Sequence, residues 1–333
     1  MKNHGIQVAP PSPTDFRAGR IPFKERNRKA NWKAYIPSGE RQRFRYFDSS
    51  ACVSFSALNI IETQLHFMRD KGLLPEEHLD FLDDYEKDGE YNLSDRFTAK
   101  MSGTTRSGNY LFSVADSLRN HGAVPEEYWP ASENFYWDDY YQNIPPHLIN
   151  KGKEFVRYFD ISYEWVLLGH TDPNVDNRYE FIKEQLQHAP IQVATHLTDS
   201  WKSGEVAAGA CEPVQHAYMV FNTEDERYHI LDHYTPYMKQ LDADYCLLWG
   251  MKIVIEPKEV KEPEYYVAIG EQWYPKPDEI SGFATTTTRL NYRRQPYVSD
   301  DTFVKTLPTG TKLEILGYAG NAGGYHWLKV KIV

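Results

Sequence analysis

The stretch "SSACVSFSALNIIE", residues 49–62, places a cysteine where a run of small residues ends and an apolar run begins. Apolar residues recur at helical spacing to about residue 70 and Gly72 follows as a stop, which predicts a helix over 52–70. Cys52 then lies in the first turn, where unpaired backbone N–H groups and the helix dipole lower the pKa of a thiol. The alternative is a buried structural cysteine, so a nucleophile requires a histidine partner.

A candidate histidine lies in the second half of the chain. His216 stands at the head of a predicted strand in "EPVQHAYMVF", residues 212–221, among small and apolar neighbours. Asp232 follows at the end of the next strand of an expected hairpin, where a carboxylate can contact the imidazole and fix its tautomer. Taken alone, a residue such as His216 is more often a satisfied core histidine, and Asp232 a turn residue.

The order of these residues resembles that of the papain-like (C1-type) cysteine peptidases. The active-site helix of that family begins Cys-x-x-Phe-Ser, which Cys52, Phe55 and Ser56 match. The family's catalytic histidine follows far downstream in a His-Ala strand context, as His216 does, and an Asn or Asp on the next strand corresponds to Asp232. The resemblance implies a thiol peptidase with Cys52, His216 and Asp232 as its catalytic residues.

Two further stretches extend the resemblance to about residues 40–256. Residues 106–130, "RSGNYLFSVADSLRNHGAVPEEYWP", are similar to the family's substrate-side glycine with its following helix and turn, so Gly108 would lend its backbone to a substrate. Residues 182–195, "IKEQLQHAPIQVAT", resemble the helix and strand before the catalytic histidine. The pattern is most similar to papain-like proteins encoded in bacteriophage and bacterial genomes.

The sequence departs from the family's pattern at the oxyanion hole. The glutamine that donates to the oxyanion normally lies about half a dozen residues before the cysteine, where this chain has Tyr46. The nearest glutamine is Gln42, and a longer loop would have to bring its amide beside the Cys52 N–H. Ser49 stands where a disulfide cysteine usually precedes the nucleophile, and Tyr234 would be the aromatic that shields the histidine–carboxylate contact.

The remaining pattern up to residue 256 predicts a helical half followed by an antiparallel half. The expected elements are helices 76–87, 110–121 and 177–189 and strands 154–168, 190–197, 214–221, 227–234 and 245–256. Such a succession predicts an α+β domain with a cleft between two lobes. The resemblance implies the papain-like two-lobed form, a helical lobe plus an antiparallel β lobe, over residues 41–256.

The composition changes again beyond residue 256. Residues 257–279 carry four prolines and many charges and are predicted to be a linker. Residues 280–333 contain short strand-like runs broken by turn residues, which predicts a small all-β barrel. Its segments "LNYR", "LPTGTKLEIL" and "WLKV" resemble, in order, the signature of bacterial SH3 domains, which implies a cell-wall or protein ligand. A structural appendage is the alternative.

Charge and hydropathy exclude several classes of partner. The net charge is −10, whereas a nucleic-acid binder usually carries an excess of basic residues, so no nucleic acid is expected. No apolar run is long enough to cross a membrane, and the N-terminus lacks the apolar core of a secretory signal. Residues 1–40 are predicted to be an extended arm, either a propeptide or a docking strap. We expect a cytoplasmic protein in the producing cell, with association with a virus particle as an alternative.

Cysteine and histidine spacing predicts neither a disulfide framework nor a metal site. Cys52, Cys211 and Cys246 cannot all pair and show no zinc-type spacing, which favours folding in a reducing compartment. The segment "DPNVDN", residues 172–177, lacks the glycine and bidentate glutamate of a calcium loop and is predicted to be a plain turn. No cofactor is expected.

The sequence therefore favours hydrolysis of a polypeptide substrate by a Cys-His-Asp site. In this hypothesis Cys52 attacks the peptide carbonyl, Gln42 stabilises the oxyanion, His216 transfers protons and Asp232 orients His216. One alternative is a peptidoglycan-peptide hydrolase, suggested by the SH3-like segment. The other is a non-catalytic structural or binding protein that keeps the fold with a degraded oxyanion hole.

Overall fold

The computed structural model describes residues 5–8, 26–206, 211–260, 265–269, 282–299 and 302–333. Most of the predicted N-terminal arm and much of the predicted linker lie outside these residues. The chain divides into two compact units, Met1–Glu259 and Val260–Val333. Each unit is described by itself.

Helix α1, Cys52–Asp70, is the central element of the N-terminal unit, as predicted. Every residue from its start to Met68 is buried, so the helix has no solvent-exposed face over this length. Gln64 Nε2 donates to the carbonyl of Ile253 at 2.9 Å, which ties the helix to the β lobe. The chain leaves α1 through Gly72, whose φ of +62° is the left-handed conformation common after a helix.

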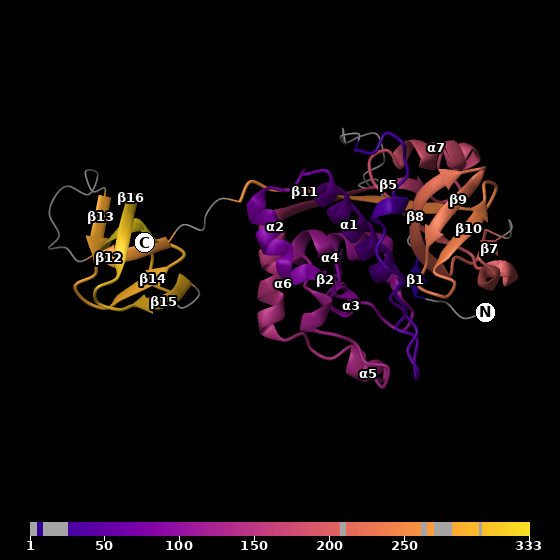
Figure 1. The fold of residues 1–333 in the computed structure, drawn as a ribbon. Helices are drawn as coiled ribbons and strands as arrows, with labels where there is room; N and C mark the ends of the chain where they lie inside the picture. The colour runs from indigo at the N-terminus through magenta and orange to yellow at the C-terminus, as the bar shows by residue number, and fades with distance from the viewer. Residues whose placement is uncertain (1–4, 9–25, 207–210, 261–264, 270–281, 300–301) are drawn as a thin grey trace. The chain divides into compact units, whose positions relative to one another are not determined.

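The helices α2 to α6 gather on one side of the N-terminal unit, indigo to magenta in Figure 1. The α-helices after α1 are α2 (Glu76–Leu82), α3 (Asp95–Met101), α4 (Leu111–His121), α5 (Trp137–Tyr140), α6 (Pro146–Tyr158) and α7 (Arg178–Gln185). The 3-10 turns are η1 (Lys33–Tyr35), η2 (Asp83–Tyr85), η3 (Glu126–Tyr128), η4 (Val175–Asn177) and η5 (Asp199–Ser203). None of the helices in the described part of the chain is long and apolar enough to cross a bilayer.

A seven-stranded sheet forms the second lobe, in the order β5-β11-β6-β8-β9-β10-β7. Its neighbours are antiparallel except β10 and β7, which are parallel. The strands are β5 (Phe159–Leu168), β6 (Ile191–Thr195), β7 (Glu205–Val206), β8 (His216–Glu224), β9 (Arg227–Leu231), β10 (Met238–Asp242) and β11 (Trp249–Pro257). Two small ladders pair β1 (Ile6–Gln7) with β4 (Asn109–Tyr110) and β2 (Glu86–Lys87) with β3 (Glu90–Tyr91).

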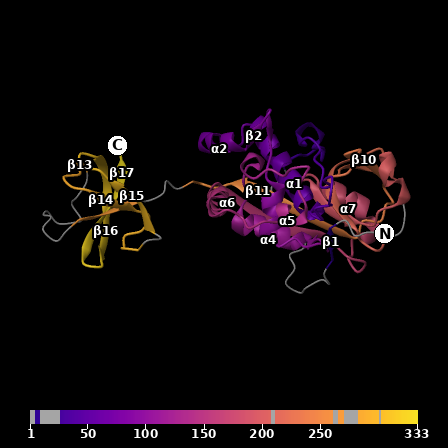
Figure 2. The ribbon, with the colours of Figure 1, turned by 90° about the horizontal axis from the view of Figure 1, so that it is seen from below.

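Helix α1 lies between the helical lobe and the strands, as Figure 2 shows from below. It packs against β8, β11 and β6, the strands at the centre of the sheet. The N-terminal residue of α1 is Cys52 and the first residue of β8 is His216. The helix-on-sheet contact therefore places the start of the helix next to the start of the strand.

The predicted fold class agrees with this arrangement, while some element boundaries differ and some helices were not predicted. The predicted helix 76–87 ends at Leu82 and continues as a 3-10 turn and strand β2. The first five residues of the predicted strand 154–168 belong to α6, because Phe155 is buried on a helix face against Phe81 and Tyr85. Helices α3 and α5 were not predicted.

A disulfide joins Cys211 to Cys246, with 5.1 Å between the Cα atoms, so the prediction of no disulfide pairing is wrong. Residues 35 apart in sequence carry no spacing signature, and the pairing arises only because the fold brings them together. The inference of a reducing compartment therefore loses its basis. Cys52 is the free cysteine and is buried.

The C-terminal unit is a six-stranded antiparallel sheet in the order β13-β16-β17-β12-β14-β15. Its strands are β12 (Tyr265–Ile269), β13 (Gly282–Thr285), β14 (Leu290–Arg293), β15 (Phe303–Leu307), β16 (Lys312–Ala322) and β17 (Tyr325–Ile332). No pairing between the described residues joins the edge strands β13 and β15, so the sheet is not the closed barrel that the sequence predicted. Trp327 is buried in this unit and Leu290 packs against its apolar core.

Strand β12 lies inside the segment that the sequence predicted to be linker. It pairs with β17 and β14 because Val267 and Ile269 enter the core of the sheet. These five residues are apolar, but the prolines and charges on both sides of them made the whole segment look like a linker.

Candidate active site

The thiol of Cys52 lies at the N-terminal end of α1 and faces the strand that begins with His216. Ala51 precedes it as the N-cap and provides no side-chain cap, so no capping side chain competes for the first-turn N–H groups. The backbone N–H groups of Ala217 and Val53 form hydrogen bonds with the thiol. Because Ala217 directly follows His216, these contacts place the sulfur beside the imidazole.

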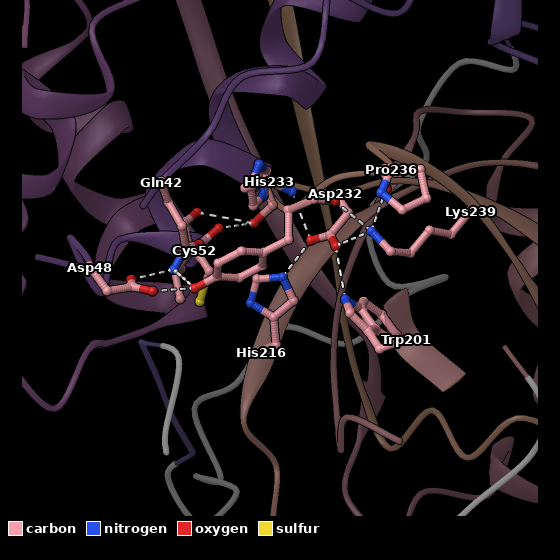
Figure 3. A network of polar contacts seen from close by, with 12 residues as sticks. Gln42, Asp48, Cys52, Trp201, His216, Asp232, His233, Pro236 and Lys239 are labelled. Carbon is pink, nitrogen blue, oxygen red and sulfur yellow. Dashed lines mark hydrogen bonds and ion pairs between the residues drawn. The ribbon is translucent and has the colours of Figure 1, made fainter. Parts of the chain in front are cut away.

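His216 and Asp232 form a buried pair. His216 Nε2 lies 2.5 Å from Asp232 Oδ1, and neither side chain is exposed. The hairpin of β8 and β9 explains the contact, since Met219 pairs with Leu231 and Asp232 follows directly. A carboxylate at Nε2 makes Nε2 the protonated nitrogen, which assigns the other ring nitrogen, Nδ1, to proton transfer. Figure 3 shows Nδ1 pointing toward the sulfur of Cys52.

Two aromatic side chains enclose this pair. Trp201 of η5 donates from Nε1 to Asp232 Oδ2 at 2.9 Å, and its ring stands edge-on to the His216 ring. Tyr234, which the sequence assigned to shielding, lies with its ring centroid 5.2 Å from that of His216. Trp201 contacts the carboxylate itself, so it takes the larger part in excluding water from the histidine–carboxylate contact.

Gln42 does reach the site across the longer loop. Its side chain is buried, and Nε2 donates to Tyr234 Oη at 2.8 Å and to Asp48 Oδ1 at 2.9 Å. Tyr234 in turn donates to the other oxygen of Asp48. Asp48 is thus held beside the amide that the sequence assigned to the oxyanion (Figure 3). Both N–H groups of this amide have acceptors, so one must be redirected to bind an oxyanion.

Burial raises the pKa of the Cys52 thiol above its usual range. The hydrogen bonds from Ala217 and Val53 lower it, whereas the charges of Asp48 and Asp232 raise it further. In this closed arrangement the thiol is favoured over the thiolate. Formation of a thiolate therefore requires that the proton pass to His216 and that the site open to its substrate.

A second histidine, His233, lies next to the pair, and its environment excludes it as a proton carrier. Its ring centroid is 5.9 Å from that of His216, and burial lowers its pKa to about 3. Phe55 packs on it at 5.2 Å, and its backbone N–H donates to Asp232 Oδ1 at 2.7 Å. His233 stays neutral at any pH near 7, and its backbone helps to hold the carboxylate.

Gly108 lies against the N-terminal end of the chain. Asn109 N–H donates to the carbonyl of Gly5 at 3.0 Å, and Gln7 Nε2 donates to the carbonyl of Gly108 at 3.0 Å. These contacts accompany the parallel pairing of β1 with β4, at the position where the sequence placed a substrate backbone. The Gly5 backbone also packs on Ser50, close to Cys52 in sequence.

A cavity of about 630 Å³ opens on the His233–Tyr234 side of the site. Three of its lining side chains are cationic, namely Arg41, Arg43 and Lys202, and no acidic side chain is among the described residues that line it. Trp201 and Tyr234 form the wall nearest to His216. This cavity therefore lies beside the two aromatic rings that enclose His216.

The sequence missed three polar residues of the site. Asp48 was hidden because its contact with Gln42 depends on the loop, and Trp201 because it stands in a short 3-10 turn with no motif. Lys239 is the second residue of β10, seven positions after Asp232, and its Nζ lies 2.6 Å from Asp232 Oδ2. No strand was predicted over this position, so no local pattern marked Lys239 as part of the site.

Within the described residues, no group of three or more His, Cys, Asp or Glu side chains could hold a metal ion. His196 uses Nδ1 in a 2.9 Å contact with the carbonyl of Pro213. His229 is partly buried, which lowers its pKa.

No family model matches the chain, and no curated protein matches it. Solved structures of similar fold include Xylellain, a cysteine protease from Xylella fastidiosa, at 14% identity and a TM-score of 0.48 over 78% of this chain and 98% of that one. Bromelain protease from Ananas comosus shares 13% identity, with a TM-score of 0.44 over 68% and 98%. Digestive procathepsin L 3 of Tenebrio molitor larval midgut shares 13%, with a TM-score of 0.45 over 76% and 76%.

Proposed function

We propose that this chain is a thiol endopeptidase in which Cys52 is the nucleophile, His216 the proton carrier and Asp232 the residue that orients it. The observation that carries the proposal is the 2.5 Å contact of His216 Nε2 with Asp232, on the strand whose next residue, Ala217, bonds to the Cys52 thiol. A thiol, an imidazole and a carboxylate in this order form a nucleophile, its base and an orienting group. We also propose, from the sequence pattern, that a bacteriophage or bacterial genome encodes the protein.

The chemistry follows from the proton positions. Cys52 gives its proton to His216 Nδ1, and a sulfur lone pair forms a bond with the substrate carbonyl carbon as the π electrons move to oxygen. Collapse of this oxyanion breaks the C–N bond, and Nδ1 returns its proton to the departing amine. Water then attacks the thioester and its proton passes to Nδ1. The C–S bond breaks and the proton returns from Nδ1 to the sulfur of Cys52, so that one peptide and one water yield an acid and an amine.

Gln42 is the side chain best placed to stabilise the oxyanion. Its Nε2 lies within one hydrogen bond of Tyr234, whose ring contacts His216. An oxyanion that replaces Asp48 as the acceptor of one Nε2 proton would receive a preorganised donor, which is worth about 3 kcal/mol in the transition state. The Asp48 carboxylate must then move or be protonated for full activity.

A substrate would lie against Gly108, because only a residue without Cβ allows a second backbone to come so close. Residues Gly5–Gln7 lie there now, in a parallel ladder with β4. This occupation supports the role of Gly108 as a site for an extended chain. It also means that a substrate must displace the N-terminal segment.

The cationic cavity indicates the kind of substrate. A residue on the amine side of the cleaved bond would enter it, since the cavity adjoins Trp201 and Tyr234 beside the proton carrier. Arg41, Arg43 and Lys202 favour a carboxylate there. We therefore expect preference for polypeptides with an acidic residue after the cleaved bond.

The test compares cleavage of an unfolded protein by the full chain and by its Cys52→Ala and His216→Ala variants. Cleavage that both substitutions abolish supports the proposal, and iodoacetamide labelling of Cys52 that slows in His216→Ala ties the two residues together. Release of soluble peptides from purified cell walls, with no cleavage of proteins, would favour the peptidoglycan hydrolase. Absence of both activities, with labelling independent of His216, would favour the non-catalytic alternative.

A further inference from the structure

Lys239 carries a buried ammonium group that the chemistry above does not use. It lies on β10 with its side chain fully buried, and Nζ donates to Asp232 Oδ2 at 2.6 Å. The other donors of Nζ reach the carbonyls of Tyr234, at 2.6 Å, and Pro236. The indole of Trp201 also lies 5.5 Å from Nζ. A lysine is almost never buried unless its charge is compensated, so this position requires a reason.

The Asp232 carboxylate accepts hydrogen bonds from four donors, two at each oxygen. Oδ1 accepts from His216 Nε2 and from the His233 N–H, and Oδ2 accepts from Trp201 Nε1 and Lys239 Nζ. Figure 3 shows Lys239 and His216 on opposite sides of this carboxylate. Rotation of the carboxylate would break two contacts at each oxygen, so its orientation toward His216 is fixed.

The charge of the carboxylate matters as much as its orientation. A lone buried carboxylate stabilises the imidazolium of its partner, and Asp232 also raises the pKa of the Cys52 thiol. A stabilised imidazolium slows the return of the proton to the departing amine, and a raised thiol pKa opposes the loss of the Cys52 proton. The Lys239 ammonium group at Oδ2 brings the net charge of the Asp232–Lys239 pair to zero, and Oδ1 still accepts from His216.

We propose that Lys239 is a positioning residue that turns Asp232 into a hydrogen-bond acceptor of no net charge for His216. The inference rests on the proposed thiol peptidase. It adds that Lys239 neutralises the charge of Asp232, so that the carboxylate can orient His216 without holding the proton on it. Lys239 does not touch a substrate. It acts through Asp232, in orientation and in charge.

A charge series at these two positions tests the inference. The Asp232 and Lys239 side chains carry net charge zero in the natural chain, minus one in Lys239→Met, plus one in Asp232→Asn and zero again in the double variant. Loss of positive charge raises the pKa of every nearby group, so both limbs of the pH profile should move up in Lys239→Met, by about one pH unit or more. Both limbs should move to lower pH in Asp232→Asn and return to their natural pH in the double variant. In Lys239→Arg, which keeps the charge, both limbs should stay at their natural pH.

The pH profile is recorded for kcat/KM on a peptide and for iodoacetamide labelling of Cys52. Several titratable or charged groups besides Asp232 and Lys239 surround His216 and stay unchanged in the series: Cys52, His233, Tyr218 and Tyr234 near its ring, and Asp48 near the thiol. Removal of the pair should lower kcat and leave KM within about twofold, since no contact with substrate is lost.

The matched control is the buried pair Lys252–Glu164, 2.7 Å apart on β11 and β5 and away from the site. Lys252→Met with Glu164→Gln removes a pair of similar burial and should leave both limbs in place. The inference would be overturned if the limbs of the pH profile did not move with the net charge of the pair. In that case the double variant would be displaced from the natural profile as far as Lys239→Met is. If the rate of Cys52 labelling is unchanged in His216→Ala, the proposed function fails. If the rate depends on His216 but not on the net charge of the Asp232–Lys239 pair, only the role of Lys239 fails.

Discussion

Gly108 faces Gly5 so closely that a Cβ built on Gly108 would lie 2.0 Å from the carbonyl carbon of Gly5. Both residues have positive φ, +88° and +112°. The N-terminal segment therefore lies directly on the backbone to which we assign the substrate. Access to the site and removal of this segment are expected to go together.

Deletion of residues 1–8 should raise both the iodoacetamide labelling rate of Cys52 and the cleavage of an unfolded protein, by about tenfold if one ladder and its side-chain contacts hold the segment. Gly5→Ala in the full chain should also raise the labelling and cleavage rates. The added Cβ would lie 2.2 Å from the Ser50 carbonyl oxygen, and this clash would weaken the contact of the N-terminal segment. Gly89→Ala is the matched control, with φ +87° and no atom within 4 Å of its Cβ. Slower labelling after the deletion would show that β1 is needed to build the site.

Asp48→Asn should shift the labelling profile of Cys52 to lower pH. The charge of Asp48 raises the pKa of the thiol, and asparagine removes the charge while its side-chain oxygen can still accept from Ser50 N–H, now at 3.1 Å. A profile measured from pH 4 to 10 checks the direction, with the exposed Asp138→Asn as the control. A profile that stays in place would mean that Asp48 does not act on the thiol.

The cationic cavity should discriminate between peptides that differ only in Glu or Gln directly after the cleaved bond. We expect Arg43→Gln to reduce the preference for Glu by about fivefold, or about 1 kcal/mol, through kcat/KM. Arg157→Gln removes an exposed cation elsewhere in the same unit and should leave the preference unchanged. An equal preference for Gln in the natural chain would refute the assignment of an acidic residue to this cavity.

Glu126 should make the fold less stable as pH rises. Burial and the neighbouring Glu40 charge raise its pKa to about 8, so the folded chain keeps a proton that the unfolded chain releases above about pH 4.3. The free energy of unfolding then falls between these two pKa values by up to ~1.4 kcal/mol per pH unit from this group. Glu126→Gln should flatten the decline measured by urea unfolding at pH 5, 7 and 9.

The control for this change is Glu127→Gln, an exposed neighbour. Glu62 and Asp95, also with pKa values raised first by burial, retain their own contributions, so the decline in Glu126→Gln is reduced and not abolished. Parallel declines in Glu126→Gln and in the natural chain would contradict the prediction.

Local patterns carried most of what the sequence could predict. The helical period of α1, its first-turn cysteine and the β8–β9 hairpin follow from neighbours in sequence, so Cys52, His216 and Asp232 could be named in advance. Gln42 could be named because few glutamines precede the cysteine. The long-range contacts could not be predicted, since nothing local marks Trp201 or Lys239 as neighbours of Asp232.

The same limit explains the errors in the fold. The pairing of Cys211 with Cys246 depends on tertiary contact, and strand β12 is short and surrounded by turn-forming residues. The contact of β1 with β4 joins residues about one hundred positions apart. Chain order predicts which elements exist, while these contacts depend on how the elements pack.

A fragment that ends after Glu259 should retain the site. The backbone N–H of Lys258 donates to the carbonyl of Tyr158 at 2.8 Å, and Lys258 Nζ donates to Val156 at 2.8 Å, so the N-terminal unit extends beyond β11. The proposed catalytic residues all precede this point, and the C-terminal unit has an apolar core of its own. The fragment should therefore match the full chain in Cys52 labelling and in kcat/KM on a small peptide.

The matched comparison is a fragment that ends after Glu256, which lacks these Lys258 contacts and should unfold at lower urea concentration. Binding to an insoluble target such as purified cell walls should be lost in both fragments, because a tethered binding unit raises local concentration without changing the chemical step. Loss of Cys52 labelling in the longer fragment would show that residues 260–333 support the site. Undiminished binding of that fragment to cell walls would instead remove the binding role from the C-terminal unit.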